Sequence, residues 1–279
     1  MKKSGNPLVS VLVTTRNSAD QLETCLRSLK KQSYANVEII VVDNNSTDNT
    51  KSIARSYTKH VYNRGPERST QRNFAAKKVA RGKYLLFLDS DMSISKSLIQ
   101  VCVYNLETKK DIVGLYIREL VTGTSFWSRV RRFERSFYDA TAIDGLRFLR
   151  KDIFLKSGGF DEKLYACEDW DLDKRIKKYG RVDFISTPLY HNESKFDIKK
   201  YLDKKYYYSV NFNTYIRKWG KNDPDIKKQF GPSYRLFWVF VESNKWKRIV
   251  KHPFLALCML VLRLLASWKY ILIRLKVDI

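Results

Sequence analysis

The sequence predicts an α/β protein built on a mostly parallel sheet, and two observations support this fold class. Short apolar runs alternate with amphipathic segments from residue 8 to residue 91, the pattern of consecutive βαβ units. The clearest run, at residues 84–88, is wholly apolar and ends in Asp89-Ser90-Asp91. Because it is too short for a stable helix and does not alternate with polar residues, we expect a central strand buried on both faces.

The elements before this strand follow from hydrophobic spacing. Residues 8–15 are apolar and β-branched, whereas residues 18–32 carry Leu22, Cys25, Leu26 and Leu29 at helical spacing. The predicted strands are 8–15, 37–42, 60–62 and 84–88, and the predicted helices are 18–32, one starting near Asn49, and 67–80.

The pattern changes after residue 97. Predicted there are a helix at 97–108, a strand at 112–117, an acidic helix from 167 to about 179, and a strand at 182–186. From residue 195 the chain is rich in Lys, Tyr and Trp and is expected to be helical. We therefore expect an α/β domain at residues 1–195 and a helical tail at 196–279.

Composition narrows the class of partner. The 279 residues include 53 Lys and Arg against 29 Asp and Glu, a net charge of +24. This charge suits a polyanion, which can be nucleic acid, an anionic membrane surface or a phosphorylated small molecule. The four cysteines are far apart without a CxxC pair, which argues against a zinc site and disulfides and favours a reducing compartment. Residues 1–7 are short and polar, unlike a signal peptide.

Polar residues follow the predicted parallel strands and should meet at one sheet edge, where open α/β sheets bind ligands. They are Thr14, Thr15, Arg16, Asn17, Asp43, Asn45, Ser46, Asp89 and Asp91. Two carboxylates one residue apart suit Mg²⁺ or Mn²⁺ carrying a diphosphate. The alternative is structural, with Asp91 or Ser93 capping a helix that starts near Ser97.

Six motifs in order then resemble those of a known family. They are residues 9–17 (VSVLVTTRN), 41–48 (VVDNNSTD), 71–73 (QRN), 89–91 (DSD), 158–162 (GGFDE) and 168–169 (ED). The chain resembles the inverting family 2 glycosyltransferases, which have a GT-A fold, of the kind that acts on membrane- or lipid-linked acceptors.

The resemblance implies roles for particular residues. A nucleotide-sugar linked to UDP, GDP or dTDP would be held by Thr14, Thr15, Arg16, Asn17, Asp43, Asn45, Arg72, Asp89 and Ser90. Many relatives have a Glu where this chain has Asn17. Asp91, assisted by Asp89 and by His191, would hold Mn²⁺ or Mg²⁺. Asp169 matches the general base and Glu168 is the second choice, whereas His191 is equally well explained as a packing residue after a strand.

The tail suggests a membrane surface. Residues 254–262 are wholly apolar, but Arg263, Lys269 and Arg274 interrupt the apolar sequence after residue 262, so a spanning helix is not expected. On a helix, Arg263, Ser267, Tyr270 and Arg274 share one face and apolar residues the other, as in a helix that lies in the interface. The alternative is a helix packed on the catalytic domain with its Lys and Arg in solvent.

These inferences together predict an enzyme on the cytoplasmic face of the membrane with a lipid-linked or glycan acceptor. One rival is a basic nucleic-acid-binding protein, for which mixed basic and aromatic residues are also typical. That rival leaves the two acidic pairs unexplained, since they would repel phosphates in the absence of metal. A second rival is an inactive relative that serves as a scaffold. Such a protein would have no need of the carboxylates in the Asp-Ser-Asp and Glu-Asp motifs, and both motifs are intact here.

Overall fold

The computed structural model describes residues 5–277 and divides the chain into two compact units. The first unit comprises Met1–Glu119, Gly145–Glu162 and Glu168–Asn192. The second unit comprises Leu120–Asp144, Lys163–Cys167 and Glu193–Ile279, so it contains two earlier segments in addition to the tail.

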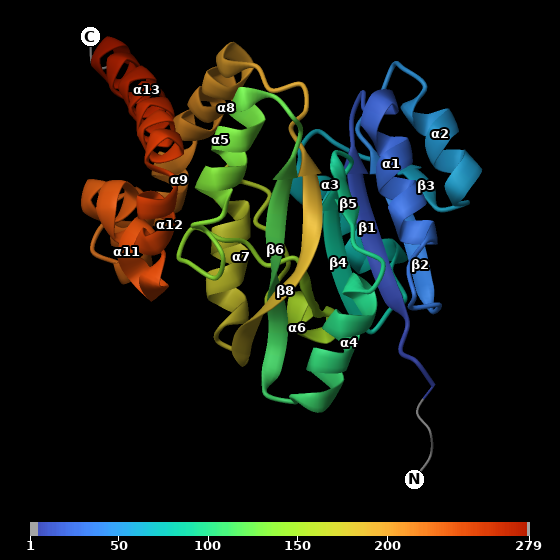
Figure 1. Cartoon of the computed structure of the whole chain (residues 1–279). Helices are drawn as coiled ribbons and strands as arrows, with labels where there is room; N and C mark the ends of the chain where they lie inside the picture. Colours follow the sequence, from blue (N-terminus) through green and yellow to red (C-terminus); the bar gives the residue numbers. More distant parts are fainter. Residues whose placement is uncertain (1–4, 278–279) are drawn as a thin grey trace. The chain divides into compact units, whose positions relative to one another are not determined.

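The first unit is organised on an eight-stranded sheet of order β3-β2-β1-β4-β7-β6-β8-β5 (Figure 1). Its strands are β1 (Val9–Thr15), β2 (Val37–Asp43), β3 (Val61–Asn63), β4 (Tyr84–Asp89), β5 (Met92–Ile94), β6 (Ile112–Thr122), β7 (Phe148–Arg150) and β8 (Arg181–Asn192). Strands β1 to β4 pair in parallel, whereas β7 pairs antiparallel with β4 and β6, and β5 pairs antiparallel with β8. The predicted mostly parallel sheet is therefore a mixed sheet with a parallel half.

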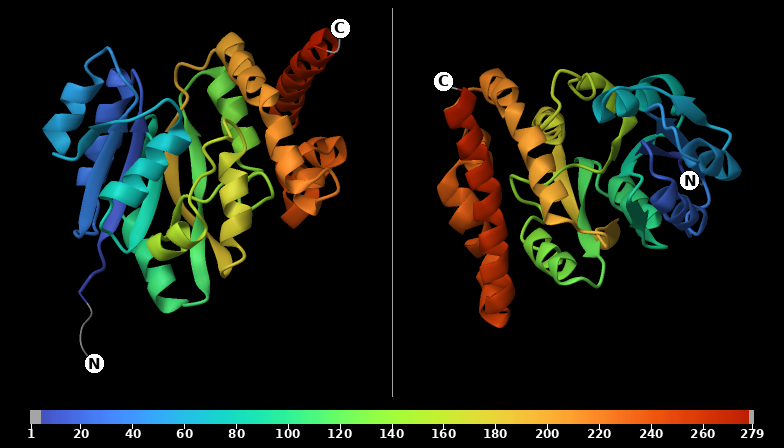
Figure 2. Two further views of the ribbon diagram at one scale, coloured as in Figure 1. Left: turned by 180° about the vertical axis from the view of Figure 1, so that it is seen from behind. Right: turned by 90° about the horizontal axis from the view of Figure 1, so that it is seen from above.

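Strand β4 is central and buried on both faces, as its apolar run predicts. Leu86 and Leu88 join one hydrophobic cluster, while Leu85 and Phe87 join the cluster on the opposite face. The first cluster is covered by α1 (Ala19–Lys30) and α4 (Leu98–Thr108). The second is covered by η1 (Ala75–Val79), α6 (Lys151–Lys156) and α7 (Glu168–Ile176), which Figure 2 shows from behind. Helix α2 (Thr50–Tyr57) follows β2.

Several boundaries differ from the sequence prediction. The single helix expected at 67–80 is α3 (Arg68–Phe74) followed by the π-helical turn η1. Strands β6 and β8 are longer than expected, so His191 lies within β8 and not after a strand. The prediction missed β5, since a three-residue strand depends on hydrogen bonds from a distant partner. Because β5 separates Asp91 from α4, the interpretation of Asp91 or Ser93 as a helix cap is wrong.

The second unit is helical, as predicted for the tail. Its helices are α5 (Phe126–Arg135), α8 (Ile198–Val210), α9 (Phe212–Trp219), α10 (Pro224–Phe230), η2 (Tyr234–Trp238), α11 (Val239–Val241), η3 (Glu242–Asn244), α12 (Trp246–Lys251) and α13 (Pro253–Val277). Helix α13 packs against α5 and α8. Among the described residues, no helix has the length and hydrophobicity needed to cross a membrane.

Arg263 on α13 is buried within the second unit, so the prediction that this residue faces headgroups or solvent is wrong. Its side chain is 6% exposed and lies 3.4 Å from Glu134 Oε1 and 2.8 Å from the Tyr138 hydroxyl. The predicted face positions Tyr270 and Arg274 have side chains outside the described residues, as do Lys269 and the apolar positions from Ile271 to Leu275.

Glu38 offers a test of how the first unit is held together. Its Oε1 accepts hydrogen bonds from Ser10 Oγ and from the Arg81 amide, both at 2.6 Å, so it joins β1 and β2 to the loop before β4. Burial by itself would raise the pKa of Glu38, but these hydrogen bonds lower it below its usual range.

We expect Glu38→Gln to lower the free energy of unfolding by about 1–3 kcal/mol at pH 7, measured by urea denaturation. Since the folded pKa lies below the unfolded one, the stabilisation is present above the unfolded pKa and is lost as the pH falls through the folded pKa. The difference from wild type should therefore shrink in acid. Exposed Glu23→Gln is the control and should leave the free energy of unfolding nearly unchanged, because its ion pair with Arg27 is screened by solvent. A difference between Glu38→Gln and wild type that does not depend on pH would contradict this account.

Candidate active site

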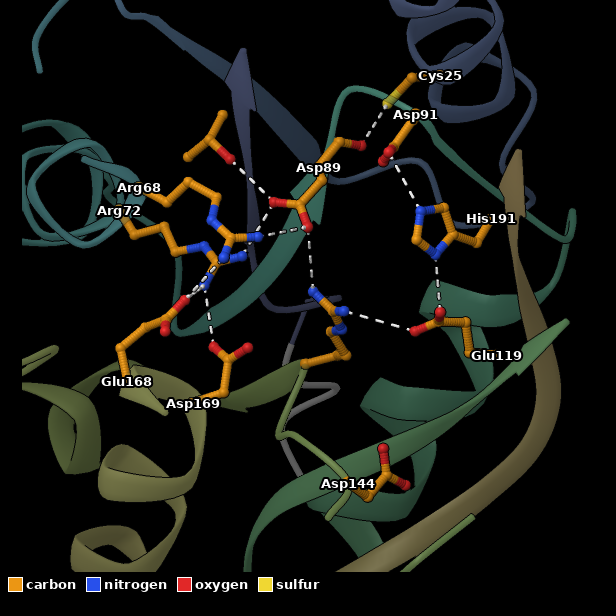
Figure 3. Close-up of polar contacts among 12 residues, drawn as sticks. Cys25, Arg68, Arg72, Asp89, Asp91, Glu119, Asp144, Glu168, Asp169 and His191 are labelled. Atoms are coloured by element: carbon orange, nitrogen blue, oxygen red, sulfur yellow. Dashed lines mark hydrogen bonds and ion pairs between the residues drawn. The ribbon is translucent and has the colours of Figure 1, made fainter. Parts of the chain in front are cut away.

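Asp89, at the end of β4, lies among three arginines (Figure 3). Its Oδ1 accepts hydrogen bonds from the Thr14 hydroxyl at 3.1 Å and from Arg72 Nη2 at 2.9 Å. Arg68 and Arg147 each place a guanidinium nitrogen 3.8 Å from Oδ2. Burial alone would raise the pKa of Asp89, but the three guanidinium groups lower it well below its usual range. Asp89 is therefore an ionised carboxylate in fixed orientation.

Arg72 connects this carboxylate to the start of α7. Its side chain is 1% exposed, and its Nη1 donates a hydrogen bond to Asp169 Oδ1 at 2.9 Å. The same nitrogen is 3.7 Å from Glu168 Oε1. One buried guanidinium thus connects the Asp-Ser-Asp motif with the Glu-Asp motif, which are far apart in the sequence.

The residues beside Arg72 explain why α3 holds this position. Gln71 Nε2 donates to the Thr15 and Val42 carbonyl oxygens at 3.1 and 2.6 Å. Asn73 Nδ2 donates to the Phe160 carbonyl oxygen at 2.8 Å. The Gln-Arg-Asn motif therefore joins the ends of β1 and β2 to the Gly-Gly-Phe-Asp-Glu turn. All three side chains are buried, so each hydrogen bond replaces one lost to water.

Glu168 and Asp169 open α7 but have different surroundings. Glu168 is buried and lies 3.3 Å from Arg68 Nη2, whereas the Asp169 side chain is 31% exposed. Burial, and next the charge of Asp169, raise the pKa of Glu168 to about 6. Of the two carboxylates, Asp169 is the one that is accessible from solvent.

Asp91 and His191 form a second group of interacting side chains at the site. The pairing of Met92 with His191 across β5 and β8 brings the imidazole beside Asp91, with Nε2 3.1 Å from Oδ2. On the other side, Nδ1 lies 2.8 Å from Glu119 Oε1 on β6. Burial would lower the pKa of His191, but Asp91 and Glu119 raise it overall to about 10. His191 is therefore a cation held between two carboxylates.

The sequence analysis missed Glu119, Arg68 and Arg147. Glu119 is a polar residue within an apolar strand, and Arg68 lies one helical turn before Arg72, so both carried a weak signal. Arg147 carried none. Its contacts with Asp89 and with Glu119, the latter at 3.5 Å, depend on the pairing of β7 with β4 and β6.

The residues predicted to bind the base and ribose lie at adjoining strand ends. The register pairs Thr14 with Asp89 and Thr15 with Asp43, as expected for one ligand-binding edge. Both oxygens of Asp43 are engaged by Ser46, whose backbone amide donates to Oδ2 at 2.8 Å. The remaining predicted residues surround them: exposed Arg16, Asn17 and Asn45, and buried Ser90, which donates to Ser18 at 2.9 Å.

Unsatisfied polar atoms mark the same place. Among the described residues, four buried side-chain atoms have no hydrogen-bond partner, and three of them are Thr15 Oγ1, Arg72 Nε and Asp91 Oδ1. Buried polar atoms are normally paired, so these three indicate a site that a ligand completes.

The donor set fits a divalent metal in part. Within the described range, no group of three or more His, Cys, Asp or Glu side chains is arranged to hold a metal ion. Asp91 nevertheless supplies one carboxylate with a free oxygen, and His191 beside it could supply an imidazole nitrogen once a metal displaces the proton it holds between Asp91 and Glu119. A metal there needs its further ligands from a bound diphosphate or from water, as is usual for Mg²⁺ and Mn²⁺.

Comparison with known proteins identifies the family of the chain. Residues 10–161 match the family model for glycosyl transferase family 2. The chain belongs to this family. The match includes the strand ends, the Gln-Arg-Asn motif and the Asp-Ser-Asp motif, so the chain is a family 2 glycosyltransferase with a GT-A fold, as its motifs predicted. A search of curated proteins gave no match.

Two solved structures illustrate the shared fold. The mannosyltransferase PcManGT from Pyrobaculum calidifontis, in complex with GDP-Man and Mn²⁺, is 18% identical with a TM-score of 0.63, over 96% of this chain and 88% of that one. S. aureus TarS 1–349 in complex with UDP is 22% identical with a TM-score of 0.55, over 88% of this chain and 75% of that one.

Glu168 provides a pH test of the site. Since its folded pKa of about 6 exceeds the usual 4.5, its ionised form destabilises the fold above pH 6. We expect Glu168→Gln to raise the free energy of unfolding by about 1–2 kcal/mol at pH 8. This increase should disappear below pH 4.5, where Glu168 is protonated in both the folded and the unfolded chain. Urea denaturation across this pH range measures the effect, with exposed Asp152→Asn as control. A variant less stable than wild type at pH 8 would show that the ion pairs with Arg68 and Arg72 outweigh burial.

Proposed function

We propose that the chain transfers a single hexose from a nucleotide-sugar to a hydroxyl or phosphate oxygen of its acceptor, with metal assistance and inversion of the anomeric centre. The observation that carries this proposal is the Arg72 side chain, which joins Asp89 at the donor edge to Asp169 at the start of α7. The charged residues proposed to bind the donor and the proposed base, Asp169, are thereby part of one site.

Asp169 is proposed as the general base. An acceptor O–H gives its proton to an Asp169 oxygen while its oxygen bonds to the anomeric carbon, and the bond from that carbon to the diphosphate oxygen breaks. Attack opposite the leaving group inverts the configuration. Arg72 donates to Oδ1 of Asp169, which fixes the orientation of the carboxylate. Buried Glu168 remains the second choice.

The leaving diphosphate gains negative charge as this bond breaks. Arg68, Arg72 and Arg147 place three guanidinium groups around Asp89, where they are positioned to stabilise that charge. Asp91 and His191 would hold the metal, with Asp89 assisting through its second oxygen. When bound, a divalent ion would act as a Lewis acid on the diphosphate oxygens.

The donor is proposed to carry UDP, GDP or dTDP. The printed ligands of structural neighbours support this class, since PcManGT is in complex with GDP-Man and Mn²⁺ and TarS with UDP or UDP-GlcNAc. Thr14, Thr15 and Asp43 at the strand ends, with Arg16, Asn17, Asn45 and Ser90 around them, are the proposed contacts to base and ribose.

The acceptor is proposed to be lipid-linked or a glycan, used by an enzyme peripheral to the cytoplasmic face of a membrane. The net charge of +24 supports a polyanionic surface. Nucleic acid is the less favoured partner, because Asp89, Asp91, Glu168 and Asp169 would repel its phosphates. An inactive scaffold is less favoured because both carboxylate motifs are intact and interconnected.

Asp169→Asn tests the base. We expect donor binding to remain normal while turnover falls by about 10²-fold or more, because the amide cannot accept the acceptor proton. Donor affinity by calorimetry and product formation by mass spectrometry measure the two effects. Asp152→Asn, which neutralises an exposed carboxylate on α6, should leave both unchanged. Near-normal turnover in Asp169→Asn would exclude it as the base.

A thermal-shift panel tests donor and metal together. UDP-, GDP- and dTDP-sugars are compared with and without Mn²⁺, since only a ligand that binds the folded state raises the melting temperature. We expect one nucleotide class to stabilise the chain in a metal-dependent way, Asp91→Asn to abolish that dependence, and His191→Ala to weaken it less. If a chelator does not change donor binding, the proposal that a metal assists is wrong. If only oligonucleotides stabilise the chain, the proposal that it is a glycosyltransferase acting on nucleotide-sugars is wrong.

A further inference from the structure

Helix α13 exposes a stripe of large apolar side chains. Phe254, Leu257, Val261, Leu264, Leu265 and Trp268 are each between 43% and 65% exposed. Their spacings of three, four, three, one and three residues place them along one side of a helix. Large apolar side chains gathered on one face are typical of an interaction surface.

The opposite side of α13 is fixed by a buried charge. Arg263 contacts Glu134 and Tyr138, and its guanidinium carbon lies 4.9 Å from the Phe240 ring centroid. Ala256, Met259 and Leu262 are buried on the same side. Turning the stripe inward would leave Glu134, which is 2% exposed, without one of its two arginine partners. The apolar stripe therefore stays outward, which is the reverse of the usual amphipathic arrangement.

Further apolar side chains of the second unit precede the stripe. Phe237 and Trp238 on η2 and Trp246 and Val250 on α12 are each at least 45% exposed, and α12 packs against α13. Lys247 and Lys251 of α12 are exposed beside them in the sequence. Tryptophans and lysines in this combination are favoured at the boundary between lipid headgroups and acyl chains.

Charge decides between possible occupants of this face. Residues 243–277 contain eight Lys and Arg and no Asp or Glu. A second copy of the chain would place two such segments against each other, and like charges would oppose the contact. An anionic membrane supplies both the apolar interior for the stripe and the phosphates for the cations.

We infer that the outward side of α13, with η2 and α12, docks on an anionic membrane surface. The apolar side chains enter the interface with the helix lying along it, and exposed cations such as Lys247 and Lys251 meet headgroup phosphates. The inference extends the proposed function by naming the surface that would bring the enzyme to a lipid-linked acceptor. The link to a lipid-linked acceptor rests on the proposed function, whereas membrane docking can occur without any turnover.

Vesicle sedimentation of the full chain tests the inference. Vesicles of phosphatidylcholine are compared with vesicles that also contain phosphatidylglycerol, at low and high salt. We expect at least tenfold stronger binding to the anionic vesicles, reduced by salt. The double variant Leu257→Ser, Leu264→Ser should lose at least tenfold of this binding. Leu155→Ser, at an exposed apolar position of α6 in the first unit, is the matched control and should bind as wild type does.

Point substitutions are preferred to truncation, because removal of α13 would leave Glu134 without Arg263. A full chain that ignores anionic vesicles, or a double variant that binds as wild type does, would overturn the inference. A dimer in sedimentation velocity that the double variant abolishes would overturn it in favour of a second copy. Donor-dependent thermal shifts should be the same in wild type and double variant, so a failure of docking is distinguishable from a failure of the proposed activity.

Discussion

The Arg72 guanidinium is the group on which the arrangement of the carboxylates at the candidate site depends. It is buried at the meeting point of Asp89, Glu168 and Asp169, whose mutual repulsion would otherwise open the site. A buried charge of this kind is tolerated because each partner is itself charged and in hydrogen-bonding range. Arg68 and Arg147 extend the same principle around Asp89. The result is a site whose carboxylates are fixed in orientation before any ligand binds, which lowers the reorganisation that catalysis would otherwise require.

Two carboxylates side by side in the sequence receive different chemical properties from this network. Glu168 is buried and its pKa is raised, whereas Asp169 is partly exposed and accepts a hydrogen bond from Arg72. Environments that separate two neighbouring acids commonly assign them different tasks. The same reasoning applies to Asp89 and Asp91. The first is surrounded by arginines, and the second keeps a free buried oxygen beside His191. The Asp-Ser-Asp motif thus divides between a position that organises cations and a position suited to a metal.

A buried ion pair also orients helix α13 within the second unit. Glu134 is held by Arg131 and Arg263, and together these charges lower the pKa of Glu134 to about 2 although burial opposes the shift. Between Phe254 and Trp268 the other residues of this helix are largely apolar, so pairing Arg263 inside forces leucine, phenylalanine and tryptophan side chains outward. The electrostatic requirement of one glutamate thereby decides which face of α13 the second unit presents.

The local sequence determined the parallel half of the sheet and the chemistry of its edge. Strand β4 and the polar ends of β1 and β2 were predictable because apolar runs and turn residues are properties of consecutive residues. Only the tertiary structure decided the partners of those residues. Strand β5, the place of His191 within β8, and the contacts of Glu119 and Arg147 all depend on pairing between segments distant in the chain. The outward apolar face of α13 was likewise unpredictable, because helical periodicity separates two faces without specifying which one is buried. That choice was made by Glu134, 129 residues before Arg263 in the chain.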